Sequence, residues 1–477
     1  MGTFNIQVIL PEIVLLGFAV VLLVAGLMTT NKRVLGLWAV LGIAAAYYFL
    51  PLSFKTPLTP LFSNMLVNDA LSMFFRTVVL IIGGLVVLLS IGYKDLDDEE
   101  KGEYYFFILT MTISMMLAVA SNNLMMIYIA LEAISLLSYI LAGYAKRDMF
   151  SSEAGLKYFL FGAVSTGITL YGVSLVYGLF GTLDLSLISQ SLMINGVNQP
   201  ALILAGLLVL VGFGFKCSLV PFHMWTPDVY QGAPTPVAAF FSVGPKAVGF
   251  AFLLRVFFQA FQFPSASMNP WACVCAAIAV LTMTLGNIVA LKQDNIKRLL
   301  AYSTIAQAGY ILLGITAWTQ LGVKATLFYI FVYALMNLGA FGVVIAVSNS
   351  IRSDRIEDYA GLYKRSPFMA IALAVSFLSL AGIPPLAGFL AKFFVFAAAL
   401  EAHLTGLVIV AALNSVVALY YYVQVVRFAF LHEPTSNIFT PQPKALILAL
   451  GLITFLVLTL GLWPHPVLNW LIELLGV

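Results

Sequence analysis

Charged residues are scarce in this chain of 477 residues. Asp, Glu, Lys and Arg make up 9% of it, against about 25% in an average soluble domain, while the apolar types AVILMFWYC reach 62%. A soluble globule of this length needs far more charge to cover its surface, so the composition indicates an integral membrane protein. The same scarcity excludes an intrinsically disordered chain, a coiled coil, a secreted disulfide scaffold and a nucleic-acid-binding protein.

Cysteine is nearly absent as well, with Cys217, Cys273 and Cys275 all lying inside apolar stretches. The chain has no CxxC pair, and Cys273 is too close to Cys275 for the usual zinc or cluster spacing. We therefore expect the three thiols to be packing residues. P-loop, GxGxxG, HExxH and paired haem-ligand motifs are also missing, so we expect no metal, cofactor or redox centre in this chain.

Long apolar runs, by contrast, fill the sequence. A membrane-spanning helix needs about 20 apolar residues, and we count about fourteen such stretches, which predicts an all-α polytopic membrane protein with a single transmembrane domain. The first stretch begins near Ile9 without basic residues before it and is long enough to span, so we interpret it as a retained helix. The stretches are centred near residues 20, 43, 80, 112, 133, 167, 210, 248, 280, 306, 335, 383, 416 and 457.

The positive charges of the loops are strongly asymmetric. Loops on one side carry fifteen lysines and arginines, whereas loops on the other side carry only Lys55. Because cytoplasmic loops are enriched in these residues, the asymmetry predicts that both termini lie on the non-cytoplasmic side. The fifteen cations follow the odd-numbered stretches: Lys32, Arg33, Lys94, Lys101, Lys146, Arg147, Lys292, Lys297, Arg298, Arg352, Arg355, Lys364, Arg365, Arg427 and Lys444.

The chain also resembles itself at an offset of 171 residues, which gives nine identities over the thirty positions from 134 to 163. This offset corresponds to five spans, and an odd number of crossings relates the two copies by inverted topology, as in many secondary transporters. We expect helices 1–3 in residues 1–100, a first repeat of helices 4–8 in 104–265, a second repeat of helices 9–13 in 270–430, and helix 14 in 442–477.

Each repeat contains a candidate broken helix. In helix 7, Pro221 ends the apolar run that contains Lys216, and in helix 12 the segment Gly382–Pro385 lies in the middle of the run. Proline removes a backbone donor and clashes with the preceding turn, so the freed carbonyls need partners from the protein or from water. We therefore expect helices 7 and 12 to be broken beside water-lined cavities.

Four ionisable residues lie where the membrane interior is expected. Glu132 is in the middle of helix 5, Lys216 is next to the first break, Lys246 is in helix 8, and Lys392 follows the second break. A charge at such depth costs several kcal/mol unless it is paired or hydrated, so a functional role is the default hypothesis. Burial disfavours the ammonium form of lysine, and a nearby carboxylate favours it. A Glu–Lys pair that forms and separates can therefore load and release a proton.

Five further residues are weaker candidates. Lys157, Lys324 and Arg76 are nearer to the ends of their spans, where they either snorkel to the surface or take part in transfer. We expect Arg255 to be an anchoring or packing residue. His223 lies at the first break, where it is either a proton donor to the site or a structural histidine.

Three segments carry a resemblance to a known family. KCSLVPFHMWTPDVYQGAPTP (Lys216–Pro236), DNIKRLLAYS (Asp294–Ser303) and LAGIPPLAGF (Leu380–Phe389) resemble the signature blocks of the antiporter-like subunits of complex I. Within that family the segment DVYQGAP (Asp228–Pro234) resembles subunit N, and lysine at position 392 also fits that branch. Because mitochondrial versions are often shorter, a bacterial or archaeal source is expected.

The resemblance implies roles for the four ionisable residues. Glu132 and Lys216 would form the ion pair of the first half-channel, Lys246 would connect the two halves, and Lys392 would be the terminal exchanger of the second. The chain departs from many relatives at Gln307, where they have histidine. Because glutamine cannot titrate, a proton hop through this position would need water instead; photosynthetic relatives tend to share the glutamine.

The function implied by the resemblance is that of a proton-translocating membrane subunit of a respiratory NADH:quinone oxidoreductase. NADH, FMN, iron–sulfur clusters and quinone (ubiquinone or another) would then be bound by partner subunits, namely the membrane subunits of the A, H, J, K, L and M types and the peripheral arm. The expected location is the inner (plasma) membrane of a prokaryote. The alternatives are an Mrp-type cation/proton antiporter subunit, the equivalent subunit of a ferredoxin-dependent photosynthetic complex, and a purely structural membrane subunit.

Overall fold

The structure, a computed structural model, describes residues 6–29, 32–54, 62, 64–96, 100–194, 198–263, 269–434 and 440–475. In these residues the regular structure is helical, and β-structure is limited to isolated bridges. The predicted all-α class is therefore confirmed. The α-helices are α1 (Leu10–Met28), α2 (Lys32–Phe54), α3 (Ala70–Ser90), α4 (Lys101–Val119), α5 (Leu124–Ala142), α6 (Met149–Phe180), α7 (Leu185–Ile194), α8 (Gln199–Cys217), α9 (Thr226–Gly232), α10 (Thr235–Phe252), α11 (Pro270–Ala290), α12 (Ile296–Thr316), α13 (Gln320–Ile351), α14 (Leu362–Arg365), α15 (Pro367–Ala381), α16 (Ala387–Glu401), α17 (Thr405–Leu431), α18 (Lys444–Leu462) and α19 (His465–Leu475).

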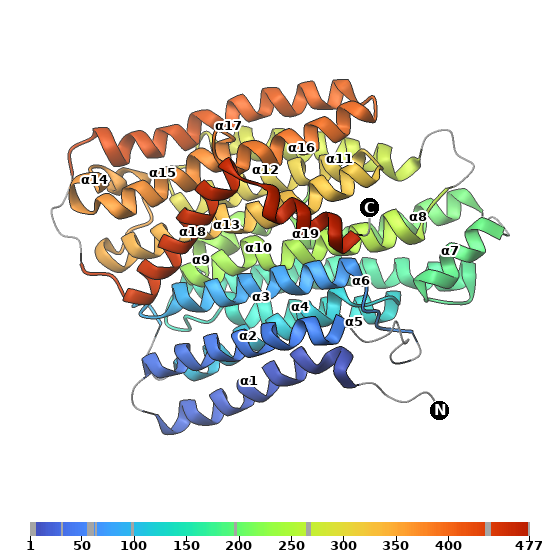
Figure 1. The fold of residues 1–477 in the computed structure, drawn as a ribbon, viewed down its shortest axis with the longest axis horizontal. Helices are drawn as coiled ribbons and strands as arrows, with labels where there is room; N and C mark the ends of the chain where they lie inside the picture. The colour runs from blue at the N-terminus through green and yellow to red at the C-terminus, as the bar shows by residue number, and fades with distance from the viewer. Residues whose placement is uncertain are drawn as a thin grey trace.

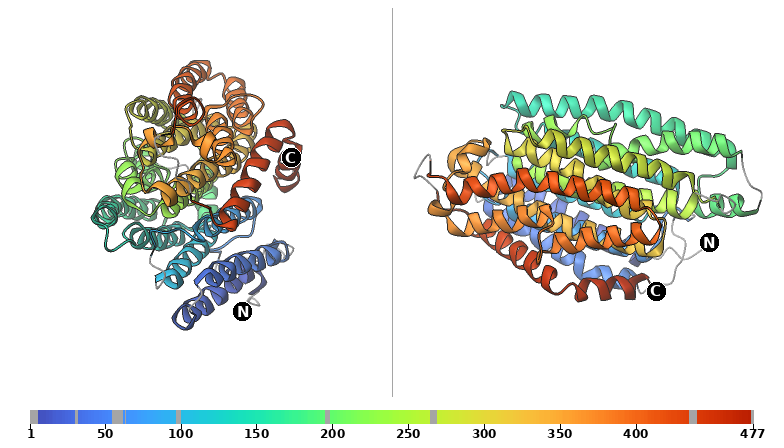
Figure 2. Two further views of the ribbon diagram at one scale, coloured as in Figure 1. Left: turned by 90° about the vertical axis from the view of Figure 1, so that its left-hand side faces the viewer. Right: turned by 90° about the horizontal axis from the view of Figure 1, so that it is seen from above.

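The long helices lie side by side along the longest axis of the molecule and form one bundle (Figures 1 and 2). Thirteen helices of the described chain are long and apolar enough to cross a membrane. The two 15-residue helices α15 and α16 follow one another and together provide a further crossing. These crossings account for the fourteen apolar stretches of the sequence, so the predicted polytopic membrane fold is confirmed.

The two ends of the bundle can be told apart by α14 and by the chain termini (Figure 1). We call the end of the bundle where α14 lies the basic end, because the last turn of this helix carries Lys364 and Arg365 (Figure 1). Both termini lie at the opposite end (Figure 1). This arrangement agrees with the asymmetry of the loops in the sequence.

Helix lengths follow the internal repeat. Helices α6 and α13 each have 32 residues, and the 171-residue offset carries the bounds of α6 onto those of α13. The bounds of α5 and α12, and those of α4 and α11, correspond to within a few residues at the same offset. This agreement supports two repeats. The division of the chain into residues 1–100, 104–265, 270–430 and 442–477 stays a prediction.

Both expected helix breaks are present, in helices 7 and 12 of the fourteen crossings. Helix α8 ends at Cys217, and the chain becomes helical again only in α9. Helix α15 ends at Ala381, and α16 begins at Ala387. Each first half stops at a residue in the left-handed conformation, Ser218 with a φ of 58° and Gly382 with a φ of 87°. Such a residue ends a helix because it turns the chain away from the helical axis.

Three helices make up the interior of the bundle. Every residue of α10 is buried, and nearly every residue of α12 and α13 is buried too. The peripheral helices α1, α2, α11, α17 and α18 bury well under half of their most apolar windows. Because the exposed parts of these helices are also apolar, the outer face of the bundle fits a lipid environment, and the interior is screened from it.

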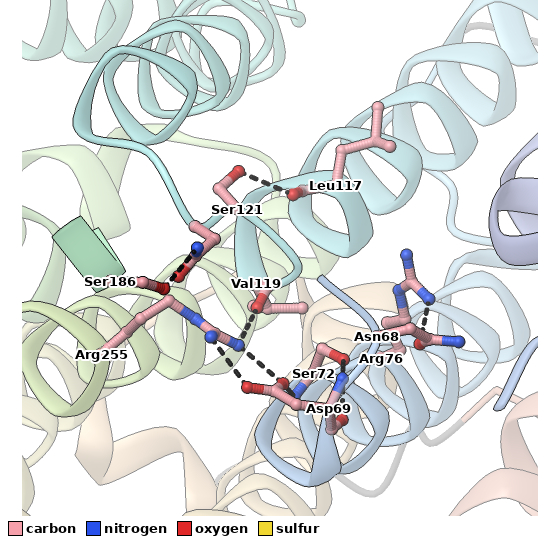
Figure 3. A network of polar contacts seen from close by, with 10 residues as sticks. Asn68, Asp69, Ser72, Arg76, Leu117, Val119, Ser121, Ser186 and Arg255 are labelled. Atoms are coloured by element: carbon pink, nitrogen blue, oxygen red, sulfur yellow. Dashed lines mark hydrogen bonds and ion pairs between the residues drawn. The ribbon is translucent and has the colours of Figure 1, made fainter. Parts of the chain in front are cut away.

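A buried arginine joins the N-terminal helices to the central helix (Figure 3). Arg255 lies in a π-helical turn (Leu253–Ala260) that follows α10, and its guanidinium makes two hydrogen bonds of 2.9 and 2.8 Å to Asp69, the N-cap of α3. It also donates to the carbonyl of Val119 at the end of α4, at 3.1 Å. The structure therefore agrees with the expected anchoring role of Arg255.

A second buried arginine has a partner that the sequence did not indicate. Arg76 on α3 is fully buried, and its Nη2 lies 3.0 Å from Oε1 of Glu12 on α1. Its Nη1 donates to Asn68 at 3.0 Å and to the carbonyl of Val8 at 3.4 Å. Of the two alternatives for Arg76, snorkelling to the surface is therefore excluded, because the N-terminal segment covers the side chain and supplies its counter-charge.

We predict that Glu12→Gln lowers the free energy of unfolding by about 3–5 kcal/mol, because it leaves the Arg76 guanidinium buried without its counter-charge. The midpoint of thermal unfolding of the purified protein in detergent measures this loss. The double variant Glu12→Gln, Arg76→Met removes both charges and should recover part of the stability. A midpoint for Glu12→Gln equal to that of the parent chain would contradict the prediction.

Candidate functional site

Lys216 lies at the first break, in the last turn of α8. Its side chain is buried, and its ammonium lies over the rings of Tyr158 and Phe215, with Nζ 5.6 and 5.8 Å from the ring centroids. Within the described chain, Nζ makes no hydrogen bond. The ammonium is therefore held mainly by aromatic faces and by the negative end of the α8 dipole, both of which favour a cation.

Glu132 lies in the middle of α5 and is the acidic group whose charge acts on the Lys216 ammonium. Its Oε1 is buried and has no hydrogen-bond partner among the described residues, as is also true of the Lys216 Nζ. The charges of the two side chains therefore interact, but no direct hydrogen bond joins them. The ion pair expected from the family resemblance stays a prediction.

Lys246 lies in the wholly buried helix α10, one residue after Pro245. Its Nζ donates to the carbonyl of Cys217, the last residue of α8, at 3.1 Å. In return, the Cys217 thiol lies 3.8 Å from the carbonyl of Lys246. The lysine of the central helix is thus bound directly to the first break.

Lys392 lies at the second break, on α16. Its Nζ donates to the carbonyl of Ala381 at 2.8 Å and to the hydroxyl of Ser415 at 2.6 Å, and it lies 4.7 Å from the ring centroid of Tyr310. Gly382 leaves room for the lysine stem, since a Cβ at that position would lie 2.9 Å from its Cδ. Both breaks therefore hold a lysine at a freed helix carbonyl.

Polar side chains continue from α10 into α13. The hydroxyl of Ser242, one turn before Lys246, accepts from the Asn337 amide at 2.6 Å, and the Ser242 carbonyl accepts from the hydroxyl of Tyr333 at 3.0 Å. All of these residues are buried. The central lysine is therefore followed by hydroxyl and amide groups rather than by a purely apolar core.

Gln307 is the centre of a second buried group of polar contacts. Its Oε1 accepts from the Tyr329 hydroxyl at 2.6 Å, and its Nε2 donates to the carbonyl of Leu380 at 3.0 Å and to the Tyr422 hydroxyl at 3.3 Å. The hydroxyl of Tyr422 also bonds Ser303. Gln307 thus connects α12, α13 and α17 to the end of α15, beside the second break.

Apart from Gln307, these polar groups were not singled out in the sequence, because single tyrosines, serines and amides in apolar helices carry no motif. The internal repeat did contain a signal. It pairs Tyr158 with Tyr329, and in the structure Tyr158 lies beside Lys216, while Tyr329 donates to Gln307.

The weaker candidates differ in exposure and in their partners. Lys157 forms ion pairs of 2.7 Å with both Glu153 and Asp228, and its side chain is partly exposed. His223 is buried in the first break, and its Nδ1 has no hydrogen-bond partner among the described residues. Lys324 lies half-buried in the first turns of α13.

The thiols and the acidic groups form no metal site in the part of the chain that is described. No group of three or more His, Cys, Asp or Glu side chains there is arranged to hold a metal ion. Cys217 and Cys275 are buried, as expected of packing residues, whereas Cys273 is exposed on α11. The packing role therefore holds for two of the three thiols.

Comparison with known proteins places this geometry in one family. Residues 121–418 match the family described as NADH:quinone oxidoreductase/Mrp antiporter, transmembrane. NADH-quinone oxidoreductase subunit N of Trichlorobacter lovleyi is 41% identical over 456 residues, which cover 94% of this chain and 93% of that protein. NAD(P)H-quinone oxidoreductase subunit 2 of Synechococcus elongatus is 43% identical over 437 residues, which cover 91% and 83%. A chain in the solved structure of respiratory complex I from Thermus thermophilus is 35% identical, with a TM-score of 0.81, and the match covers 96% of this chain and 99% of that one.

We predict that Gly382→Ala disturbs the second break. A Cβ there would press against the Lys392 stem, and the left-handed conformation costs a residue other than glycine about 1–2 kcal/mol. The midpoint of thermal unfolding should fall accordingly. Gly178→Ala on α6, where a Cβ would meet nothing within 4 Å, is the matched control and should leave the midpoint unchanged or slightly raised. Equal midpoints for the two variants would contradict the prediction.

Proposed function

Since the chain belongs to the NADH:quinone oxidoreductase/Mrp antiporter transmembrane family, we propose that it is a proton-translocating membrane subunit of a respiratory NADH:quinone oxidoreductase. Quinone reduction elsewhere in the complex drives it through electrostatic and conformational coupling. The chain itself supplies the proton path, and the electron-transfer chemistry takes place in other subunits.

One observation carries this proposal, namely the row of buried ionisable groups through the centre of the bundle. Lys216, Lys246 and Lys392 are all nearly inaccessible to solvent, and two of them bind carbonyls at the helix breaks. Buried ionisable residues in a membrane are costly and mark ion or proton pathways by default. Ammonium groups bind no metal cation, so the lysine-rich row supports a proton rather than sodium as the transported ion.

The first half of the path begins at the basic end. A proton taken up there reaches Lys216, whose charge is balanced by Glu132, and then passes to Lys246 beside the carbonyl of Cys217. Water molecules bridge the gap between Glu132 and Lys216, since the buried polar atoms of both side chains have free hydrogen-bonding capacity. His223 in the break assists uptake.

The second half of the path runs from Lys246 to Lys392. The hydroxyl groups of Tyr333 and Tyr329 lie along it. Both donate hydrogen bonds in the structure, and a hydroxyl oxygen also has lone pairs that can accept a proton. The amide of Gln307 does not titrate, so it orients the tyrosine hydroxyls and the proton crosses this point by way of hydroxyls and water. From Lys392 the proton leaves at the opposite end of the bundle.

The orientation follows from the positive charges. The basic end faces the cytoplasm, in keeping with the positive-inside rule, and both termini face outward from a prokaryotic inner membrane. The partners are the other membrane subunits and the peripheral arm of the complex, which hold NADH, FMN, iron–sulfur clusters and quinone.

A second candidate function differs in the electron donor. The cyanobacterial NAD(P)H-quinone oxidoreductase subunit 2 is as similar to this chain as the subunit N of Trichlorobacter lovleyi, and glutamine at position 307 also fits the photosynthetic branch. In that case the chain has the same role in a ferredoxin-dependent complex. The proton path is the same in both candidates.

We predict that Lys216→Ala and Glu132→Gln each lower proton pumping at least about tenfold, since a positioned proton-transfer group typically contributes roughly 10²–10⁴-fold. Coupled quinone reduction should fall with pumping, and assembly of the complex should remain intact. The measurement is acidification of sealed vesicles that contain the complex, with quinone reduction and subunit content followed in parallel.

Lys364→Ala is the matched control, because Lys364 is an exposed lysine that pairs with Glu433, and this variant should pump normally. Normal pumping by both Lys216→Ala and Glu132→Gln would refute the proposed path. Sodium-stimulated proton exchange by the isolated chain would instead identify an Mrp-type antiporter.

We also predict that a tag on this chain recovers quinone-site and iron–sulfur subunits from membranes in mild detergent. Mass spectrometry of the recovered proteins tests this, and the electron-input subunits among them identify the donor. Recovery of the chain alone, or with small antiporter-type partners only, would argue against redox coupling.

A further inference from the structure

Asp228 holds cations from both halves of the molecule. Its Oδ2 lies 2.7 Å from Nζ of Lys157 on α6, and its Oδ1 lies 2.8 Å from Nη1 of Arg298 on α12. Asp228 itself belongs to α9, the short helix that follows the first break, and α9 packs against both α6 and α12. One carboxylate therefore joins the broken helix to a helix of each repeat.

Through Lys157, Asp228 is connected to the residues that surround Lys216. Tyr158, the next residue on α6, stacks on Trp225 with ring centroids 4.2 Å apart, and the Lys216 ammonium lies over the Tyr158 ring. The indole of Trp225, the N-cap of α9, donates to the carbonyl of Phe215 at 3.0 Å. A shift of α9 relative to α6 must therefore change the surroundings of Lys216.

Through Arg298, Asp228 is connected to the residues that surround Lys392. Arg298 lies in the first turn of α12, and its guanidinium also donates to the Gln231 side chain on α9 at 2.9 Å. Further along the same helix, Gln307 contacts the end of α15, and Tyr310 faces the Lys392 ammonium. Because a helix moves largely as a rigid rod, displacement of its Arg298 end reaches the second break.

We propose that Asp228 is a positioning residue that couples the two lysine sites, by fixing α9 to α6 and α12 at once. This inference rests on the proposed proton-translocating function. Asp228 touches neither Lys216 nor Lys392; it sets the relative position of the elements that surround them. When the double contact is intact, a change at one break is transmitted to the other.

A structural role alone does not account for this arrangement. The side chains of Asp228 and Lys157 are both more than a third exposed, and exposed ion pairs contribute little to stability. Neutralising Asp228 should therefore leave the chain folded and assembled. Its effect should be seen in coupling rather than in yield or thermal stability.

Asp228 also stays charged across the neutral range. Partial burial opposes its ionisation, but hydrogen bonds from Lys157 and Arg298 outweigh burial and hold the pKa of the carboxyl below its ordinary value. Two further charged groups contact the elements around Asp228. Glu153 pairs with Lys157, and Lys297 on α12, which pairs with Asp354, donates to the carbonyl of Gln231 on α9 at 3.1 Å. A lowered pKa means that the double contact is present at neutral pH and is lost only as the pH falls below the ordinary range of aspartate, about 3.9.

The test uses Asp228→Asn in the whole complex, reconstituted in sealed vesicles and started with NADH. Mutations that act on coupling change it by roughly twofold to thirtyfold, so the protons pumped per quinone reduced should fall at least about twofold. The fall should be the same at about pH 6 and pH 8, because the carboxylate of the parent chain is ionised at both. Asp228→Glu keeps the charge and should restore most of the ratio.

Single and double variants add a second criterion. Lys157→Met and Arg298→Met each remove one of the two ion pairs and should each lower the ratio. Asp228→Asn already removes both pairs, so combining it with either variant should lower the ratio no further than Asp228→Asn alone. Glu433→Gln, which breaks the exposed pair with Lys364, is the matched control and should pump normally. If Asp228→Asn reduces assembly, Arg298→Gln provides the same test, because it leaves the Lys157–Asp228 pair in place.

A normal pumping ratio in Asp228→Asn would overturn the inference, and so would a loss confined to high pH, which would mark Asp228 as a proton carrier. In either case a defect in Lys216→Ala would leave the proposed function standing. Normal pumping in Lys216→Ala and Glu132→Gln as well would overturn the proposed function together with the inference.

Discussion

The structure depends on the match between buried ammonium groups and the carbonyl ends of broken helices. Lys246 binds the carbonyl of Cys217 at 3.1 Å, and Lys392 binds that of Ala381 at 2.8 Å. Cys217 and Ala381 are the last residues of α8 and α15, where carbonyls have no intrahelical partner and carry the negative end of the helix dipole. Inside a membrane, an unpaired carbonyl and an unpaired ammonium are each costly. In this arrangement each one satisfies the other.

This requirement explains the layering of the bundle. The breaks leave irregular backbone at membrane depth, which is tolerated only where protein or a water-filled cavity surrounds it. Helices α10, α12 and α13 provide the protein around the breaks and are almost wholly buried, whereas the outer helices expose apolar faces. The tyrosine, serine and amide groups on the buried helices then find partners in one another, as Gln307 does with Tyr329 and Tyr422. The polar row is therefore a consequence of where the breaks lie.

Much of this architecture follows from one-dimensional properties of the chain. The hydropathy of a segment shows whether it can lie in the membrane, so all fourteen crossings could be counted from the sequence. Both breaks could be located as well, because proline and glycine disturb a helix at their own position in the chain. The partner of Arg76 could not be found in this way, because Glu12 meets it only through the packing of α1 over α3. The same holds for Gln307, whose contacts lie on three other helices. Depth in the membrane is encoded locally, whereas pairing across helices is decided by the tertiary fold.

The two break sites differ in what balances the lysine. Lys392 is held by a carbonyl, a hydroxyl and the face of Tyr310, none of which changes charge at neutral pH. Lys216 has aromatic faces and the charge of Glu132, which lies on a different helix and shares no direct hydrogen bond with it. A displacement of α5 relative to α8 therefore alters the electrostatic balance at Lys216. The balance at Lys392 depends instead on its break and on α12 and α17, which carry Tyr310 and Ser415. Under the proposed function, the first break is thus the site whose charge balance is set by a carboxylate on another helix, whereas the second is set by neutral groups.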